Sequence, residues 1–129
     1  MPAAAKVIAA VVDDQQTMRS LVRASLNQIG ISEVRMYATG AEALEKLQTE
    51  PVHVLFSDFN MPGMDGLELL RAIRSDPKFA KMAFIMLTGR TDKEMVQKAV
   101  EMGANNYLGK PFSPIQLKQK IEQVFGTLT

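Results

Sequence analysis

The chain contains no cysteine and no tryptophan, only one histidine, and no long hydrophobic run. The lack of cysteine excludes disulfide bridges and thiolate metal sites. No apolar stretch approaches the roughly 20 residues that span a bilayer, so the sequence predicts no membrane partner. The formal net charge is only +1 and the basic residues are dispersed, which argues against a nucleic-acid partner. We therefore expect a soluble protein of the cytoplasm.

The residues that are present suit one globular domain. The chain has 129 residues, of which 47% are hydrophobic and 22% charged. A domain of this size buries roughly two-thirds of its unfolded surface. The sequence has no internal repeat, low-complexity tract or linker, so we expect residues 1–129 to form a single domain.

Short apolar runs alternate five times with segments whose apolar residues recur at helical spacing. The runs predict strands at Val7–Val12, Glu33–Tyr37, Val52–Ser57, Ala83–Thr88 and Asn106–Gly109. The helical spacing covers Met18–Ile29, Ala41–Leu47, Leu67–Ile73, Met95–Val100 and Ile115–Leu128. Five such βα units with short connections predict an α/β fold with a doubly wound parallel sheet.

Helix boundaries carry recognisable signals. Three pairs have capping-box spacing: Thr39 with Glu42, Thr91 with Glu94, and Ser113 with Gln116. Pro114 would occupy the first position of the last helix, where its missing N–H costs nothing. Gly30 and Gly103 follow the first and fourth helices, where a left-handed residue often ends the helix.

Charged residues follow three of the predicted strands. Asp13 and Asp14 follow the first strand, Asp58 follows the third, and Lys110 follows the fifth. In a doubly wound sheet, ligands bind outside the carboxyl ends of the strands. Three carboxylates that meet there repel one another and require a cation, and an all-oxygen ligand set favours Mg²⁺. A metal, a lysine and a carboxylate together make a phosphoryl-acceptor site.

With these residues in these positions, the chain resembles the receiver domain of two-component response regulators. The matching motifs are VVDD (Val11–Asp14), SDFNMPGMDG (Ser57–Gly66), LTG (Leu87–Gly89) and GKPF (Gly109–Phe112). Within that family the sequence is most similar to the single-domain chemotaxis regulators of the CheY type, which have no output domain. The resemblance implies a flavodoxin-like fold in which five helices surround a five-stranded sheet of order 2-1-3-4-5.

The resemblance also implies roles for the matching residues. Asp58 would accept a phosphoryl group from a CheA-like histidine kinase. Asp14 would bind Mg²⁺ directly and Asp13 mostly through water, with the backbone carbonyl of Asn60 completing the protein ligands. Lys110 would pair with a phosphoryl oxygen.

A second group of residues would transmit the signal. The resemblance implies that the Thr88 hydroxyl moves to bind the phosphoryl group and that Tyr107 turns inward in response. Pro111 would follow a cis peptide bond that directs Lys110 into the site. The surface that changes would be the face of the fourth and fifth helices, with a flagellar motor switch protein as the expected partner.

Plainer interpretations stand beside these. Asp14 alone is compatible with a helix cap, Asp58 with a turn residue, and Tyr107 with a half-buried packing residue. His53 has no second histidine beside it, so we expect it to be packed or exposed at an edge. The methionines are expected mainly to fill gaps in the core.

Two positions depart from the family pattern. Gly89 follows the switch threonine where alanine is more usual, which should loosen the loop. Arg90 lies where family members tune the attack of water on the phosphoryl group. The sequence does not decide whether Arg90 shields that group or contacts a partner.

The same residues bear on rival functions. An aspartyl phosphatase would need a second acid two residues after Asp58, and Asn60 stands there. A nucleotide or flavin module would need a glycine- or hydroxyl-rich loop after the first strand, where Asp13 and Asp14 would repel phosphate. A phosphate sink or relay receiver that does not bind the motor remains compatible with the sequence.

Overall fold

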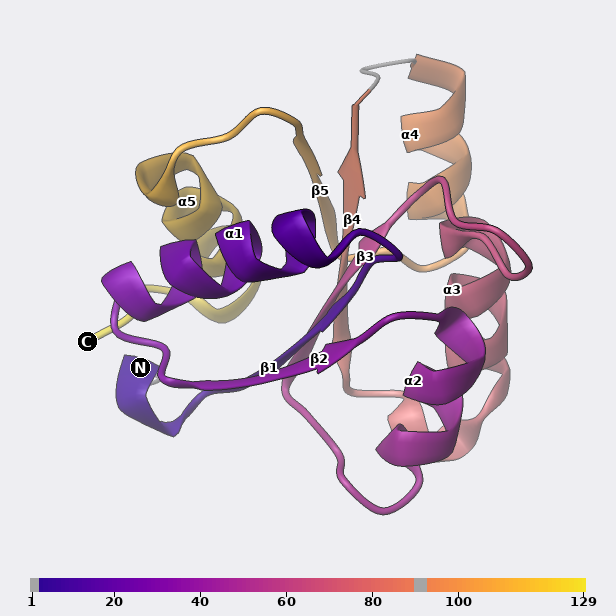
Figure 1. Cartoon of the computed structure of the whole chain (residues 1–129), viewed down its shortest axis with the longest axis horizontal. Coiled ribbons are helices and arrows are strands. Elements are labelled where there is room, and N and C mark those ends of the chain that lie inside the picture. The colour runs from indigo at the N-terminus through magenta and orange to yellow at the C-terminus, as the bar shows by residue number, and fades with distance from the viewer. Residues whose placement is uncertain (1–2, 90–92) are drawn as a thin grey trace.

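Five parallel strands form the centre of the molecule, with helices on both faces (Figure 1). The structure is a computed structural model that describes residues 3–89 and 93–129. The strands are β1 (Ile8–Val12), β2 (Glu33–Tyr37), β3 (Val54–Asp58), β4 (Ala83–Thr88) and β5 (Asn106–Gly109). Their spatial order is β2-β1-β3-β4-β5 and every neighbouring pair is parallel, which confirms the predicted topology.

The helices divide between the two faces of the sheet. Helices α1 (Gln16–Gln28) and α5 (Pro114–Phe125) cover one face, and α2 (Gly40–Leu47), α3 (Gly66–Ser75) and α4 (Lys93–Glu101) cover the other (Figure 1). Two short 3₁₀ helices, η1 (Ala4–Lys6) and η2 (Pro77–Phe79), were not predicted. In the described part of the chain, no helix combines the length and apolarity that a bilayer crossing requires.

Each face of the sheet has its own apolar core, because successive strand residues point to opposite sides. In β1, Ala9 and Val11 face α1 and α5, whereas Ala10 and Val12 face α2 and α3. All four are fully buried. Burial on both faces explains why the central strands are almost continuously apolar in sequence.

Most of the helix signals act as predicted. The Ser113 hydroxyl accepts a hydrogen bond from the Gln116 N–H, and the Gln116 side chain completes the capping box. Thr39 accepts from the Glu42 N–H, without the reciprocal contact. Gly30 and Gly103 have φ values of 99° and 106°, as expected after α1 and α4. Thr91 lies outside the described residues.

Several boundaries differ from the prediction. Strand β1 begins at Ile8 and β3 at Val54; the exposed His53 imidazole accepts the Ile8 N–H through Nδ1 at 2.9 Å. The backbone still links the segments here, because the His53 N–H donates to the Ile8 carbonyl at 2.9 Å and the His53 carbonyl accepts from the Ala83 N–H at 3.0 Å. Helix α5 ends at Phe125, because Gly126 has a φ of 85°, so the assignment of Leu128 to the helix was wrong. Leu128 instead is buried in the core cluster that also contains residues of α1 and α5.

Candidate functional site

Three carboxylates meet at the carboxyl edge of the sheet. Asp13 directly follows β1 and Asp58 is the last residue of β3. The preceding residues, Val12 and Ser57, are paired across the two strands, so the chain directions alone place both acids at one level. Single carboxylate oxygens of Asp13, Asp14 and Asp58 lie within 4.8 Å of one another. The convergence that was predicted from the strand ends is therefore present.

The three acids differ in their access to solvent. Asp13 is buried, Asp58 is partly buried and Asp14 is exposed. The N-cap residue of helix α1 is Gln15, whose side chain accepts no capping hydrogen bond, so Asp14 is not the cap of this helix. The cluster therefore opens to solvent on the side of Asp14.

Lys110 brings a positive charge to the acids from the end of β5. Its Nζ lies 2.8 Å from Asp58 Oδ1 and 3.4 Å from Asp13 Oδ2. The Lys110 N–H donates to the Thr88 carbonyl at 2.7 Å, which ties the lysine to the neighbouring strand. The peptide bond between Lys110 and Pro111 is cis, as expected.

The charges in the cluster do not balance. Three carboxylates and one ammonium leave a formal charge of −2. Two unit charges 4.8 Å apart repel by about 3.5 kcal/mol at an effective dielectric constant of about 20. Burial raises the pKa of Asp13 and the charge of Asp58 adds to this, although the Gln15 N–H and Lys110 partly offset the effect. The ionised site is therefore electrostatically unfavourable without a further cation.

Hydrogen bonds to the main chain hold the loops around the acids. Arg19 of α1 donates to the carbonyl of Asp13, and the Ser57 hydroxyl donates to the carbonyl of Asp58 at 3.0 Å. Phe59 N–H donates to the Leu87 carbonyl at 3.0 Å. These contacts fix the main chain on both sides of Asp58 and do not depend on the acids being ionised.

Gly66 is a positioning residue that the sequence reasoning missed. A Cβ at Gly66 would lie 2.5 Å from the Asp58 carbonyl oxygen and 2.8 Å from Met86 Sδ, so only glycine fits. It begins α3, which the Asp65–Glu68 capping box starts. The capping-box spacing of Asp65 and Glu68 before an apolar helix was the signal that could have identified this start.

The other predicted site residues differ in their burial and in their position relative to the acidic cluster. Thr88 is buried at the end of β4, one residue beyond the partner of Asp58 in the sheet register. Asn60 is exposed in the loop after β3, and Pro111 is exposed after Lys110. Tyr107 is half-buried in the middle of β5, opposite Met86, and is therefore not part of the acidic cluster. Arg90 lies outside the described residues.

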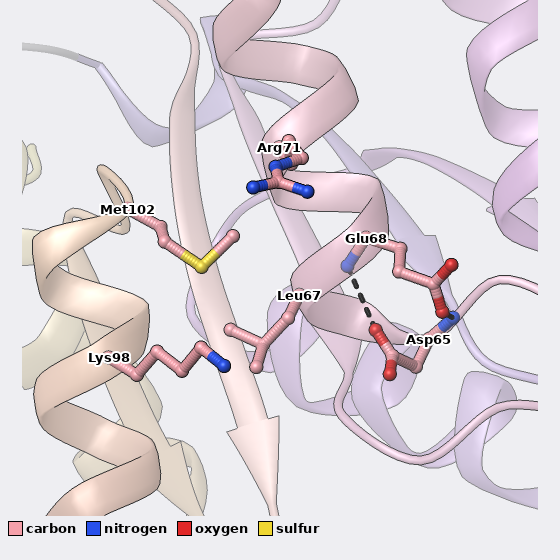
Figure 2. Close-up of a pocket in the computed structure, with 6 residues that line it drawn as sticks. All are labelled: Asp65, Leu67, Glu68, Arg71, Lys98 and Met102. Atoms are coloured by element: carbon pink, nitrogen blue, oxygen red, sulfur yellow. Dashed lines mark hydrogen bonds between the residues drawn. The ribbon is translucent and has the colours of Figure 1, made fainter.

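A separate hollow of about 270 Å³ lies between α3 and α4 (Figure 2). Leu67 and Met102 give it apolar walls, with Arg71 and Lys98 beside them. Asp65 and Glu68 also line it, but their carboxylates already cap α3. None of the predicted site residues lines this hollow.

Comparisons with known proteins agree with this geometry. Residues 9–122 match the family model of the response regulator receiver domain. A probable chemotaxis protein CheY of Rhizobium etli is 42% identical over 128 residues, covering 99% of both chains. Chemotaxis protein CheY1 of Helicobacter pylori is 43% identical over 118 residues, covering 91% of this chain and 95% of the relative.

A solved structure of chemotaxis protein CheY4 of Vibrio cholerae superposes with a TM-score of 0.85 at 36% identity. The superposition covers 92% of this chain and 98% of that one. Fold, sequence and family model agree over nearly the whole chain, and the carboxylates and the lysine of the matching motifs meet at the carboxyl edge of the sheet. The chain therefore belongs to the response regulator receiver domain family, and within it is a response regulator of the CheY type.

Proposed function

We propose that this chain is a single-domain, cytoplasmic response regulator that accepts a phosphoryl group on Asp58 and signals through phosphorylation-dependent protein binding. The main support for this proposal is the contact between Lys110 Nζ and Asp58 Oδ1, 2.8 Å apart, inside a cluster of three carboxylates. Asp58 is partly exposed, whereas Asp13 is buried, so Asp58 is the carboxylate with both a cationic neighbour and an open side.

The donor set fits a magnesium ion. The ligands are hard carboxylate oxygens that lie within 4.8 Å of one another, and the net formal charge of −2 is neutralised by one divalent cation. Asp13, Asp14 and Asp58 would hold Mg²⁺ together with the Asn60 carbonyl. When bound, Mg²⁺ supplies positive charge to the oxygens of the transferring group.

The reaction is a phosphoryl transfer from a phosphohistidine of a histidine kinase. A carboxylate oxygen of Asp58 attacks the phosphorus atom, the P–N bond breaks, and the imidazole leaves. Lys110 neutralises charge on a phosphoryl oxygen, and the Thr88 hydroxyl binds another. Water later cleaves the acyl phosphate and restores Asp58, so the chain acts as a self-catalysed phosphoacceptor. It does not turn over external phosphoesters, because Asn60 cannot supply acid–base catalysis.

The output surface is proposed to be the face formed by α4, β5 and α5. Tyr107 lies on β5, the edge strand of the sheet, and is half-buried. A change at Tyr107 therefore reaches the surface directly. By similarity to the chemotaxis proteins, the partners would be a CheA-like kinase and the flagellar motor switch protein.

The test compares wild type with Asp58→Asn, a substitution that keeps the shape of the side chain and removes the nucleophile. Beryllofluoride, a phosphoryl mimic, is added with and without Mg²⁺, and backbone amide shifts are recorded by NMR. We expect Mg²⁺-dependent shifts that reach Thr88 and Tyr107 in wild type and are absent in the folded mutant.

Two outcomes would contradict the proposal. Mimic-dependent shifts in the Asp58→Asn protein would refute the assignment of the phosphoacceptor. Shifts in wild type that stop at the acidic cluster and leave Tyr107 unchanged would contradict the signalling role and favour a phosphate sink. The folded state of the mutant is checked by its urea denaturation midpoint.

A further inference from the structure

The ammonium group of Lys120 lies over the aromatic ring of Tyr107, 4.4 Å from the ring centroid. The two residues belong to different layers of the fold. Lys120 is on α5, which packs with Leu117 and Ile121 against one face of the sheet. Tyr107 packs against the core cluster on the opposite face, which includes Ala99 and Met86. Because β5 is the edge strand, Lys120 can reach around the edge of the sheet to the ring.

Asn106 ties the backbone of both residues together. Its Nδ2 donates to the Lys120 carbonyl at 3.0 Å and to Gln123 Oε1 at 2.8 Å. Its Oδ1 accepts the Tyr107 N–H at 2.9 Å. Two of these hydrogen bonds therefore fix the backbone of Lys120 relative to that of Tyr107 without involving either side chain, and the lysine needs only its own stem to reach the ring.

The ammonium has no competing partner among the residues that the structure describes. The ion pairs found there involve Arg35 and Lys110, and Lys120 is in none of them. Both Lys120 and Tyr107 are half-buried, so the contact is partly shielded from water. A cation over an aromatic face at this distance is attracted by the ring quadrupole, and at a partly exposed site this shifts a conformational equilibrium about two- to fivefold.

We propose that Lys120 is a positioning residue that holds Tyr107 in its resting conformation and so sets how readily the ring moves. This inference rests on the proposed function, in which Tyr107 changes position when Asp58 is phosphorylated. A ring that leaves Lys120 loses the contact, so removing the ammonium lowers the free energy needed for the change. By linkage, the same removal strengthens binding of the phosphoryl mimic by the same factor.

The experiment uses 3-fluorotyrosine incorporation and ¹⁹F NMR. The chain has only two tyrosines, so the spectrum has two signals, which Tyr107→Phe assigns. Tyr37 is 5% exposed and serves as an internal reference for the fold. The variants are Lys120→Met, which keeps the stem without the charge, and Lys120→Arg, which keeps a cation over the ring. Lys118→Met is the matched control on the same helix.

We expect Lys120→Met to move the Tyr107 signal toward its position in the beryllofluoride-bound protein and to lower the beryllofluoride midpoint two- to fivefold. Tyr37 should not move, and Lys120→Arg and Lys118→Met should resemble wild type. The inference is overturned if Lys120→Met leaves the Tyr107 signal in place, raises the midpoint, or is matched by Lys120→Arg.

Failure of the proposed function gives a different result. In that case beryllofluoride moves no signal in wild type, yet Lys120→Met still shifts the Tyr107 resonance of the untreated protein. The positioning role would then stand without the phosphorylation switch.

Discussion

Replacing Asp13 by asparagine tests whether the acidic cluster destabilises the fold when no divalent cation is present. Asparagine keeps the shape of the side chain and an oxygen that can accept the Gln15 N–H, which Asp13 Oδ1 now accepts at 2.9 Å. The substitution removes one buried negative charge. It therefore separates the electrostatic contribution of Asp13 from its packing.

The magnitude follows from the distances. Asp13 lies within 4.8 Å of two carboxylates, each of which repels it by about 3.5 kcal/mol at an effective dielectric constant of about 20, less for the exposed Asp14. Lys110 at 3.4 Å attracts it by about 5 kcal/mol on the same scale. Burial of the charge adds a further unfavourable contribution. The net effect disfavours ionised Asp13, in agreement with its raised pKa.

We expect Asp13→Asn to raise the free energy of unfolding by roughly 1–2 kcal/mol at pH 7.5 in EDTA. The pKa of Asp13 is higher in the folded than in the unfolded state, so the folded state binds this proton more tightly. Wild type therefore loses stability as pH rises through the unfolded pKa toward the folded one. The advantage of the mutant should disappear below about pH 4, where Asp13 is protonated in both states.

The assay is urea denaturation of both proteins at pH 7.5 and pH 3.5, with Glu45→Gln as the control for removing an exposed carboxylate. Adding Mg²⁺ at ten times its dissociation constant should stabilise wild type by about 1.4 kcal/mol and the mutant by less. The reasoning is refuted if Asp13→Asn is less stable than wild type in EDTA, or if its advantage grows as the pH falls.

Three further substitutions test the surroundings of the acids. Gly66→Ala should lower the free energy of unfolding by about 1–3 kcal/mol and weaken beryllofluoride binding, because the new Cβ would meet the Asp58 carbonyl. In Gly89→Ala the new Cβ would have no atom within 4 Å. This substitution should therefore leave the free energy of unfolding unchanged or raise it by up to about 1 kcal/mol. Urea denaturation compares the two, and equal stability of Gly66→Ala and wild type would contradict the close approach. Lys110→Ala should bind Mg²⁺ about tenfold more tightly in an NMR titration, because the formal charge of the site falls from −2 to −3. Unchanged or weaker Mg²⁺ binding would mean that Lys110 does not act as a counter-charge.

The elements and their order were predictable because their signals are local. Alternating apolar runs and helical spacing are properties of short segments, and capping pairs such as Ser113 with Gln116 act within one helical turn. The errors occurred at element ends, where contacts from distant segments compete. Leu128 continues the apolar spacing of the last helix in the sequence. In the structure that helix ends before Gly126, and Leu128 is buried in the core from the irregular segment that follows.

By itself, the sequence determined that Asp13, Asp14, Asp58 and Lys110 lie at the carboxyl ends of strands of a parallel sheet, and the topology of such sheets brings strand ends to one edge. Only the tertiary structure decided which acid is buried, which one Lys110 contacts, and that Gly66 has no room for a side chain. It also decided that Lys120 reaches around the sheet edge to Tyr107. Burial and side-chain distance depend on how separate segments pack, and residue spacing along the chain carries no record of that packing.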